Sequence, residues 1–146
     1  MQFKIIYFGK IKNKNLLDEV DKLKKRISRI EFIELSEVKG SDIKIIQKKE
    51  FDSMNKYMTS ENYNILLLED GIEFSTKSFF NYLKRIEKPI YFFITGPYGP
   101  LEQLRLEFDL ILSLSKMTFT SQQTVYLLIE QLYRVDCFVK NIPYTK

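Results

Sequence analysis

The sequence predicts an α/β fold, in which helices cover both faces of a parallel β-sheet. Short apolar segments typical of buried strands alternate five times with segments of helical periodicity. The composition is that of a globular protein, with 45% hydrophobic and 29% charged residues. A length of 146 residues suits one domain, so we expect residues 1–146 to form a single unit.

Five short segments are predicted to be strands because apolar, β-branched and aromatic residues are concentrated in them. Gly9 ends the first segment, and the Asp70-Gly71 turn ends the third. The fourth begins after Pro89 and runs directly into a Gly- and Pro-rich loop. The predicted strands cover residues 2–8, 30–35, 63–68, 90–94 and 110–114.

Helices are predicted where apolar residues recur at intervals of three and four. Ser41 with Asp42 can cap the second helix, and Ser75 or Thr76 can cap the third. The predicted helices cover about 14–28, 42–58, 76–86, 101–107 and 122–140. In parallel sheets ligands bind beyond the carboxyl ends of the strands, so the irregular loops 95–100 and 115–121 are the first places to expect a site.

Composition excludes several kinds of chemistry. The chain has no histidine, so a mechanism built on an imidazole base or a Ser-His-Asp triad is excluded. With Cys137 as the single cysteine, we expect neither an internal disulfide nor a metal site. Nor is there a run of eighteen apolar residues or a signal-peptide pattern, so we expect a cytoplasmic protein without a membrane partner.

The positive charge is concentrated in the first part of the chain. Residues 1–60 hold 14 Lys or Arg against nine Asp or Glu, whereas residues 61–146 hold nine against ten. The densest cluster comprises Lys22, Lys24, Lys25, Arg26 and Arg29. Such a cluster suits a polyanion such as RNA. Charge alone nevertheless favours the simpler interpretation of a solvated lysine-rich helix face.

The loop at 95–100 combines two glycines and two prolines in six residues. Glycine lets a backbone approach a ligand closely, and proline fixes the turn. The loop lacks the Gly-Lys-Ser/Thr ending of a P-loop and is not a Gly-x-Gly-x-x-Gly motif. On these grounds alone, a sharp turn without a ligand is as good an interpretation as a binding loop.

Three segments of the C-terminal part carry a specific resemblance. They read Ile-Thr-Gly-Pro-Tyr-Gly at 94–99, Leu-Ser-Leu-Ser-Lys-Met-Thr-Phe at 112–119 and Leu-Ile-Glu-Gln-Leu-Tyr-Arg at 128–134. In sequence and spacing they resemble the ribosomal large-subunit methyltransferase H family of the SPOUT class. Leu67 ahead of Gly71, together with the two ends of the chain, extends the resemblance over essentially the whole sequence.

The resemblance implies a SPOUT-type α/β fold whose C-terminal part threads a trefoil knot. It also implies S-adenosylmethionine-dependent methylation of N3 of a pseudouridine in large-subunit (23S) rRNA, with rRNA in assembled ribosomes as the expected partner. The family acts as a homodimer, in which the C-terminal tail of one chain completes the other's site. By position, the implied cofactor-binding residues are Leu67, Thr95, Leu114, Ser115, Lys116, Met117, Thr118 and Phe119.

Arg134 and Tyr144 are the implied catalytic residues. For Arg134 the simpler alternative is a helix-surface ion pair with Glu130, four residues earlier. Lys116 has the alternative of a solvated loop lysine. Cys137 is expected to pack in the last helix rather than act as a nucleophile, because no base lies near it in the sequence.

The chain departs from the family pattern at four places. Thr95-Gly96 replaces two glycines, and Thr120-Ser121 replaces a Pro-His pair. Val125 stands in place of an arginine, and Thr145 in place of the histidine in the tail. These departures keep two alternatives open: an RNA- or ribosome-binding dimer that has lost the chemistry, or a methyltransferase that acts on another RNA.

Overall fold

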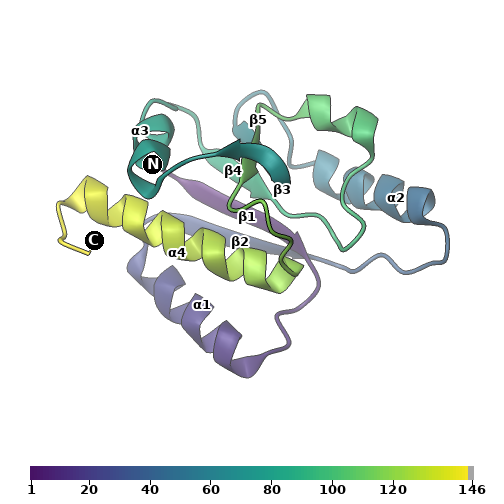
Figure 1. Cartoon of the computed structure of the whole chain (residues 1–146), viewed down its shortest axis with the longest axis horizontal. Helices are drawn as coiled ribbons and strands as arrows, with labels where there is room; N and C mark the ends of the chain where they lie inside the picture. The colour runs from purple at the N-terminus through teal and green to yellow at the C-terminus, as the bar shows by residue number, and fades with distance from the viewer. Residues whose placement is uncertain (145–146) are drawn as a thin grey trace.

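The computed structural model describes residues 1–144 and confirms the parallel α/β fold (Figure 1). Five strands form one sheet in the order β2-β1-β4-β3-β5, and each neighbouring pair is parallel. The strands are β1 (Phe3–Phe8), β2 (Ile30–Leu35), β3 (Tyr63–Glu73), β4 (Ile90–Phe93) and β5 (Leu110–Ser113). The threading of the C-terminal part through a trefoil knot stays a prediction.

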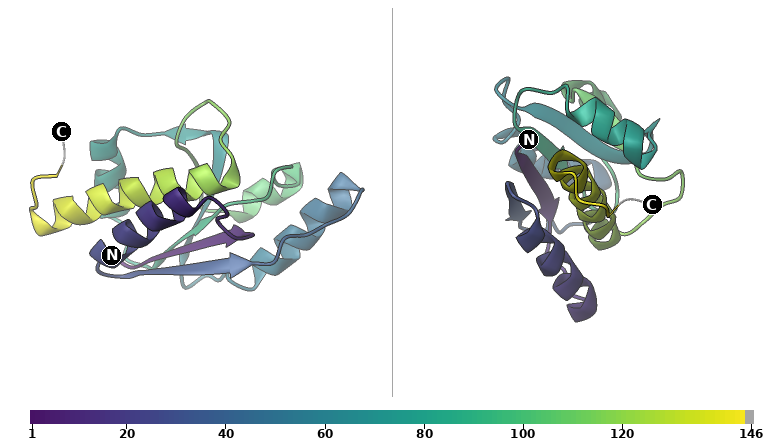
Figure 2. Two further views of the ribbon diagram at one scale, coloured as in Figure 1. Left: turned by 90° about the horizontal axis from the view of Figure 1, so that it is seen from below. Right: turned by 90° about the vertical axis from the view of Figure 1, so that its left-hand side faces the viewer.

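Helices cover both faces of the sheet, as predicted. One face carries α1 (Lys14–Arg26), α3 (Thr76–Leu83) and α4 (Ser121–Lys140). The other carries α2 (Ile43–Asn55) and the 3-10 helix η1 (Glu102–Glu107). Figure 2 shows α1 and α4 side by side on one face of the sheet. Within residues 1–144, no helix combines the length and the apolar character needed to cross a membrane.

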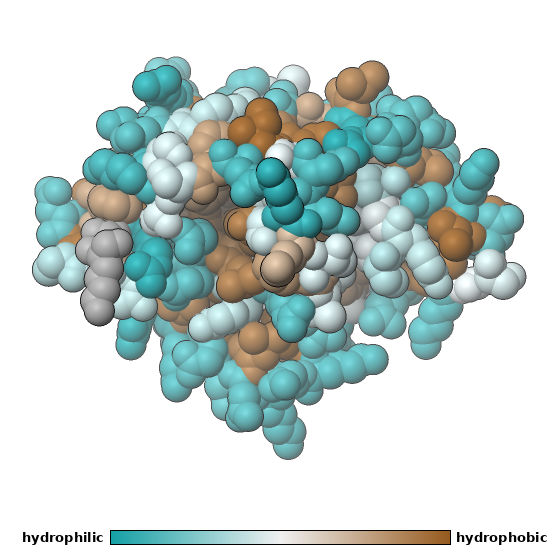
Figure 3. All heavy atoms as spheres, viewed as in Figure 1, coloured by the Kyte–Doolittle hydropathy of each residue, from teal (hydrophilic) through white to brown (hydrophobic). Residues whose placement is uncertain are grey.

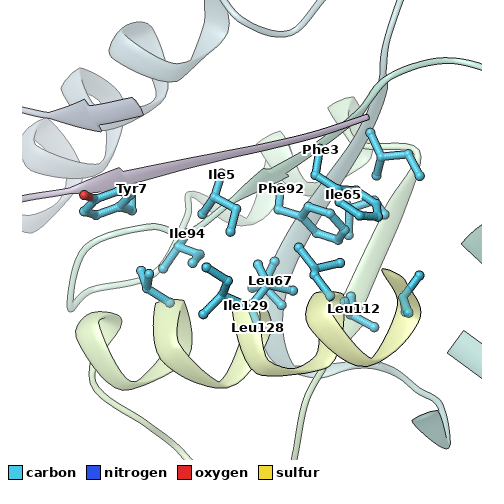
Figure 4. Close-up of a cluster of buried hydrophobic side chains, with 14 of the residues drawn as sticks. Phe3, Ile5, Tyr7, Ile65, Leu67, Phe92, Ile94, Leu112, Leu128 and Ile129 are labelled. Carbon is cyan, nitrogen blue, oxygen red and sulfur yellow. The ribbon is translucent and has the colours of Figure 1, made fainter. Parts of the chain in front are cut away.

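The larger core lies between the sheet and α4. Figure 4 shows strand side chains such as Ile5, Phe92 and Leu112 pointing toward Leu128 and Ile129 of the helix. The fully buried residues of α4 are Val125, Leu128, Ile129, Leu132 and Val135. Because burying one such side chain contributes roughly 1.5–3 kcal/mol, this helix face is a main source of stability.

The smaller core lies on the opposite face, where Ile6, Leu66 and Phe93 meet Met54 of α2 and Phe108 after η1. Adjacent residues of a strand point to opposite faces, so each strand of the sheet interior must be apolar at nearly every position. This explains the continuous apolar runs in the sequence. Figure 3 shows that hydrophilic side chains cover most of the outer face seen there, with apolar ones gathered near its centre.

Polar residues fix the helix starts. Asp42 and Ser75 cap α2 and α3 as predicted, each accepting a hydrogen bond from a backbone N–H in the first turn. Thr120 caps α4 in a reciprocal arrangement with Gln123. The predicted helix ends at 28, 58 and 86 were wrong by two or three residues, since the helices end at Arg26, Asn55 and Leu83.

Strand β3 continues beyond the predicted turn at Asp70-Gly71. Its register against β5 shifts between Leu67 and Ile72, so both of these residues lie opposite Leu112. Gly71 makes this pairing compatible with β5, because a Cβ atom there would lie 2.6 Å from the carbonyl oxygen of Ile111. The prediction that the strand ends at residue 68 was therefore wrong, since the Asp-Gly pair sits within an irregular strand.

Replacing Gly71 with alanine is expected to lower the free energy of unfolding by about 1–3 kcal/mol, because backbone must move to admit the methyl group. Gly40→Ala is the matched control, since a Cβ atom there meets only Ile46, at 3.6 Å. Denaturant titration of both variants checks this. An equal effect of the two substitutions would contradict the close approach of β3 and β5.

Candidate functional site

A cavity of about 540 Å³ opens beyond β4 and β5, beside the register shift of β3. Residues 67–69, 94–99 and several residues of 112–124 form its wall. The volume lies in the range of small-molecule sites. Both irregular loops identified in the sequence contribute to this cavity, and it lies where ligands bind in parallel α/β folds.

Seven of the eight residues expected to bind a cofactor line this cavity. They are Leu67, Thr95, Leu114, Ser115, Met117, Thr118 and Phe119. Lys116 is not in the wall: its side chain is 87% exposed, and its Nζ lies 3.9 Å from a carboxylate oxygen of Glu73. The structure therefore brings three distant segments together around one space, while their role in binding stays a prediction.

A side chain of helix α2 forms hydrogen bonds to the backbone of the loop at 95–100. The amide nitrogen Nε2 of Gln47 donates to the carbonyl oxygens of Tyr98, Gly99 and Pro100 at 3.0, 3.2 and 3.3 Å. Gly99 has a φ of +68°, which favours glycine at this turn. The loop shape thus depends on a side chain outside the cavity.

Two departures from the family pattern contact one another. The hydroxyl of Ser121 donates to the carbonyl oxygen of Thr95 at 3.0 Å, joining the start of α4 to the loop after β4. Thr95 is buried and keeps a negative φ, so its backbone accommodates a side chain. Val125, a third departure, is fully buried in the core. Thr145, the fourth, lies outside the described residues.

The second loop has its own internal hydrogen bonds. The hydroxyl of Ser113 donates to the carbonyl oxygens of Glu69 and Ser115 at 3.0 and 2.9 Å. The backbone N–H of Met117 in turn donates to the hydroxyl of Ser115 at 3.1 Å. These bonds anchor residues 113–117 to β3 and shape the wall of the cavity.

Arg134 and Tyr144 lie away from this cavity within the same chain. Arg134 follows Ser121 by thirteen residues of helix, which is about 20 Å along the axis. The predicted pair with Glu130 is confirmed, with Nε and Oε1 2.8 Å apart. The guanidinium also lies 5.0 Å from the Tyr144 ring, which packs 4.8 Å from the Tyr133 ring.

The basic end of α1 lies against this aromatic cluster. The Arg26 guanidinium is 5.9 Å from the Tyr133 ring, and the Lys140 amine is 3.5 Å from the Arg26 carbonyl oxygen. The lysine-rich part of α1 and the end of α4 therefore belong to one surface. Cys137 is buried beneath it, which confirms its predicted packing role.

Sequence reasoning missed two acidic residues at the site. Glu69 is the one carboxylate among the residues lining the cavity. Glu50 of α2 is buried behind the loop, with Oε1 accepting from the N–H of Gly96 at 3.4 Å. Its spacing from Ile46 and Met54 places Glu50 on the buried face of α2, a signal that the sequence does contain. In the described part of the chain, no three metal-ligating side chains cluster together.

Fold and site define an α/β protein with a small-molecule cavity at the carboxyl edge of a parallel sheet. Residues 1–145 match the family described as "Predicted SPOUT methyltransferase". The chain belongs to this SPOUT methyltransferase family and is therefore a methyltransferase.

Proteins named "Ribosomal RNA large subunit methyltransferase H" are similar over nearly their full length. The one from Thermotoga neapolitana is 31% identical, with 99% of both chains covered. The one from Malacoplasma penetrans is 32% identical, with 100% of both covered. A solved structure titled as a probable methylase family protein from Haemophilus influenzae has a TM-score of 0.59 at 9% identity, covering 99% of this chain and 70% of the other, which supports the fold.

Ser121→Ala is expected to lower the free energy of unfolding by about 1 kcal/mol, because the carbonyl oxygen of the buried Thr95 loses its donor. Ser53→Ala is the control, since that hydroxyl bonds only to the carbonyl of Lys49 on an exposed helix surface. Thermal and denaturant unfolding measure the stability of both variants. A change no larger for Ser121 than for Ser53 would argue against this bond as a link between the loops.

Proposed function

We propose that this chain uses S-adenosylmethionine to methylate N3 of a pseudouridine in large-subunit (23S) rRNA. We place the reaction in the cytoplasm, on assembled ribosomes, and assign it to a homodimer with a C-terminal trefoil knot in each chain. The observation that carries the proposal is the meeting of Leu67, Thr95 and loop 114–119 around one cavity. The names of the full-length relatives support the choice of RNA.

The residues present fit S-adenosylmethionine. Leu67, Leu112 and Phe119 offer an apolar wall for a planar base, while Ser115 and Thr118 offer hydroxyls. The carboxylate of Glu69 can accept hydrogen bonds from ligand hydroxyls or N–H groups. When bound, this cofactor supplies a methyl group already activated by its sulfonium sulfur.

The work left to the protein is mainly alignment. The bonds from Gln47 to loop 98–100 and from Ser121 to Thr95 fix the walls on one side. The hydrogen bonds of the Ser113 hydroxyl fix the walls on the opposite side of the cavity. A preformed cavity of this kind holds the reacting groups in line without the cost of ordering loops during the reaction. Transfer breaks the bond between the methyl carbon and the sulfonium sulfur, forms the bond from N3 to the methyl carbon and releases the N3 proton. Because the chain has no histidine, that proton would pass to water or to a group other than an imidazole.

The location of Arg134 and Tyr144 supports a shared site. Within one chain these residues lie about 20 Å along α4 from the start of the cavity wall at Ser121. A partner chain can supply the same residues across an interface. The basic surface around Arg26 would then face RNA beside the partner's cavity, where it can bind phosphates.

Methyl transfer from labelled S-adenosylmethionine tests the proposal. The substrates are ribosomes that lack the modification and, in parallel, naked rRNA, and mass spectrometry identifies the modified base. We expect label on a pseudouridine of the large subunit, with ribosomes preferred. Absence of label on both substrates, from folded and dimeric protein, would instead favour a binding dimer without chemistry or a methyltransferase for another RNA.

Mixing two inactive variants tests whether the chains share a site. Tyr144→Ala removes the tail residue, and Thr118→Arg obstructs the cavity. Each variant alone is expected to be inactive. After denaturation and joint refolding, mixed dimers hold one intact cavity beside one intact tail, so about a quarter of the unaltered activity should return.

Two controls complete this experiment. Tyr144→Ala alone should bind S-adenosylmethionine nearly as well as the unaltered chain, because the tyrosine packs on Tyr133 and Arg134 rather than in its own cavity. Ile142→Ala, a change at an exposed neighbour, should remain active. Failure of the refolded mixture to regain activity would count against a tail that acts on the partner's cavity.

A further inference from the structure

Glu50 is a buried carboxylate with little compensation for its charge. It is 3% exposed and is the one charged side chain among the buried residues of the described chain. Its hydrogen bond to the N–H of Gly96 is long, at 3.4 Å, and within residues 1–144 it forms no ion pair. Burial raises the pKa of this carboxyl group, and the Gly96 N–H offsets part of that rise. A buried charge of this kind is costly unless something nearby balances it.

The carboxylate lies directly behind the wall of the proposed cofactor cavity. Gly96 lines that cavity and also contacts Glu50. A Cβ atom on Gly96 would overlap the Glu50 carboxylate, so the absence of a side chain at Gly96 lets this carboxylate lie against the loop backbone. Only the thickness of the loop backbone therefore separates a buried negative charge from the space for the ligand.

The remaining charges around Glu50 do not neutralise it. Glu50 also lines a second cavity of about 410 Å³ on the far side of the loop, together with Glu37 and Lys39. Both of these side chains are exposed to solvent, and their charges are opposite in sign. The titratable side chains that line the first cavity, the proposed cofactor cavity, are those of Glu69 and Tyr98. Among the described residues that line the first cavity, none carries a positive charge.

We propose that Glu50 is a positioning residue whose buried negative charge favours the positively charged sulfonium of S-adenosylmethionine over its uncharged product, S-adenosylhomocysteine. This inference rests on the proposed function. The two ligands differ by one methyl group and one positive charge at sulfur. For charges about 10 Å apart at an effective dielectric constant of about 20, the attraction corresponds to roughly a tenfold preference. Loss of the methyl group removes this attraction, which helps the spent cofactor to leave.

Two variants of α2 separate the charge of Glu50 from its structural contacts. Glu50→Gln keeps the shape and an oxygen acceptor for Gly96 but removes the charge, and it also removes the cost of burying a charge. Gln47→Met is the matched control, because it removes the bonds to loop 98–100 from the same helix without changing any charge.

Calorimetric titration gives the affinity of each variant for three ligands. These are S-adenosylmethionine, S-adenosylhomocysteine and sinefungin, whose amine carries a positive charge near the position of the sulfonium. In Glu50→Gln we expect the two charged ligands to weaken about tenfold and S-adenosylhomocysteine to change less than about twofold. In Gln47→Met all three should weaken by one common factor. Glu50→Ala, a second neutral variant, should lose the same preference if Glu50→Gln does not fold.

If the neutral Glu50 variants bind all three ligands more weakly by the same factor, Glu50 only supports the structure of the loop, and the inference is overturned. An unchanged affinity for all three would overturn it as well. In both cases binding by the unaltered chain leaves the proposed function standing. Absence of binding of every ligand to the unaltered, folded chain would instead overturn the proposed function and this inference together.

Discussion

The fixed packing of α4 on the sheet is the constraint on which the rest of the structure depends. Val125, Leu128 and Ile129 are fully buried against strand residues, which sets the position of the helix and of its first turn. Thr120 and Ser121 therefore reach the loop after β4, and the chain entering α4 is held beside β3 and β5. The cavity exists because this helix cannot shift without losing much of the larger core.

The departures from the family pattern are best understood through this packing. Ser121 and Thr95 bond to one another, and Thr120 forms the reciprocal cap of α4. Val125 completes the buried face of the helix. At these positions the chain uses hydroxyl and methyl groups for local order, so their side chains are engaged within the protein. A mechanism that relies on holding the reacting groups in line depends on the shape of the cavity and on a reactive cofactor. Such a mechanism is compatible with these replacements.

Patterns that depend on local physics could be predicted from the sequence. Apolar runs located all five strands, and Asp42 and Ser75 marked helix starts, because burial and capping act on neighbouring residues. The extension of β3 could not be predicted, since it depends on Gly71 meeting Ile111 forty residues away. Likewise, the resemblance pointed to the two loops that line the cavity, whereas the positions of Glu50 and Glu69 depend on how α2 and β3 face those loops.

Hydrogen exchange with and without S-adenosylmethionine tests most directly whether loops 94–99 and 114–120 form the cofactor site. These loops and the segment near Leu67 line one cavity, while α1 lies on the far side of α4 from them. We expect the ligand to slow amide exchange in the two loops and near Leu67, and to leave α1 and α3 unchanged. Slower exchange confined to other segments, or no slowing with saturating ligand, would contradict the account.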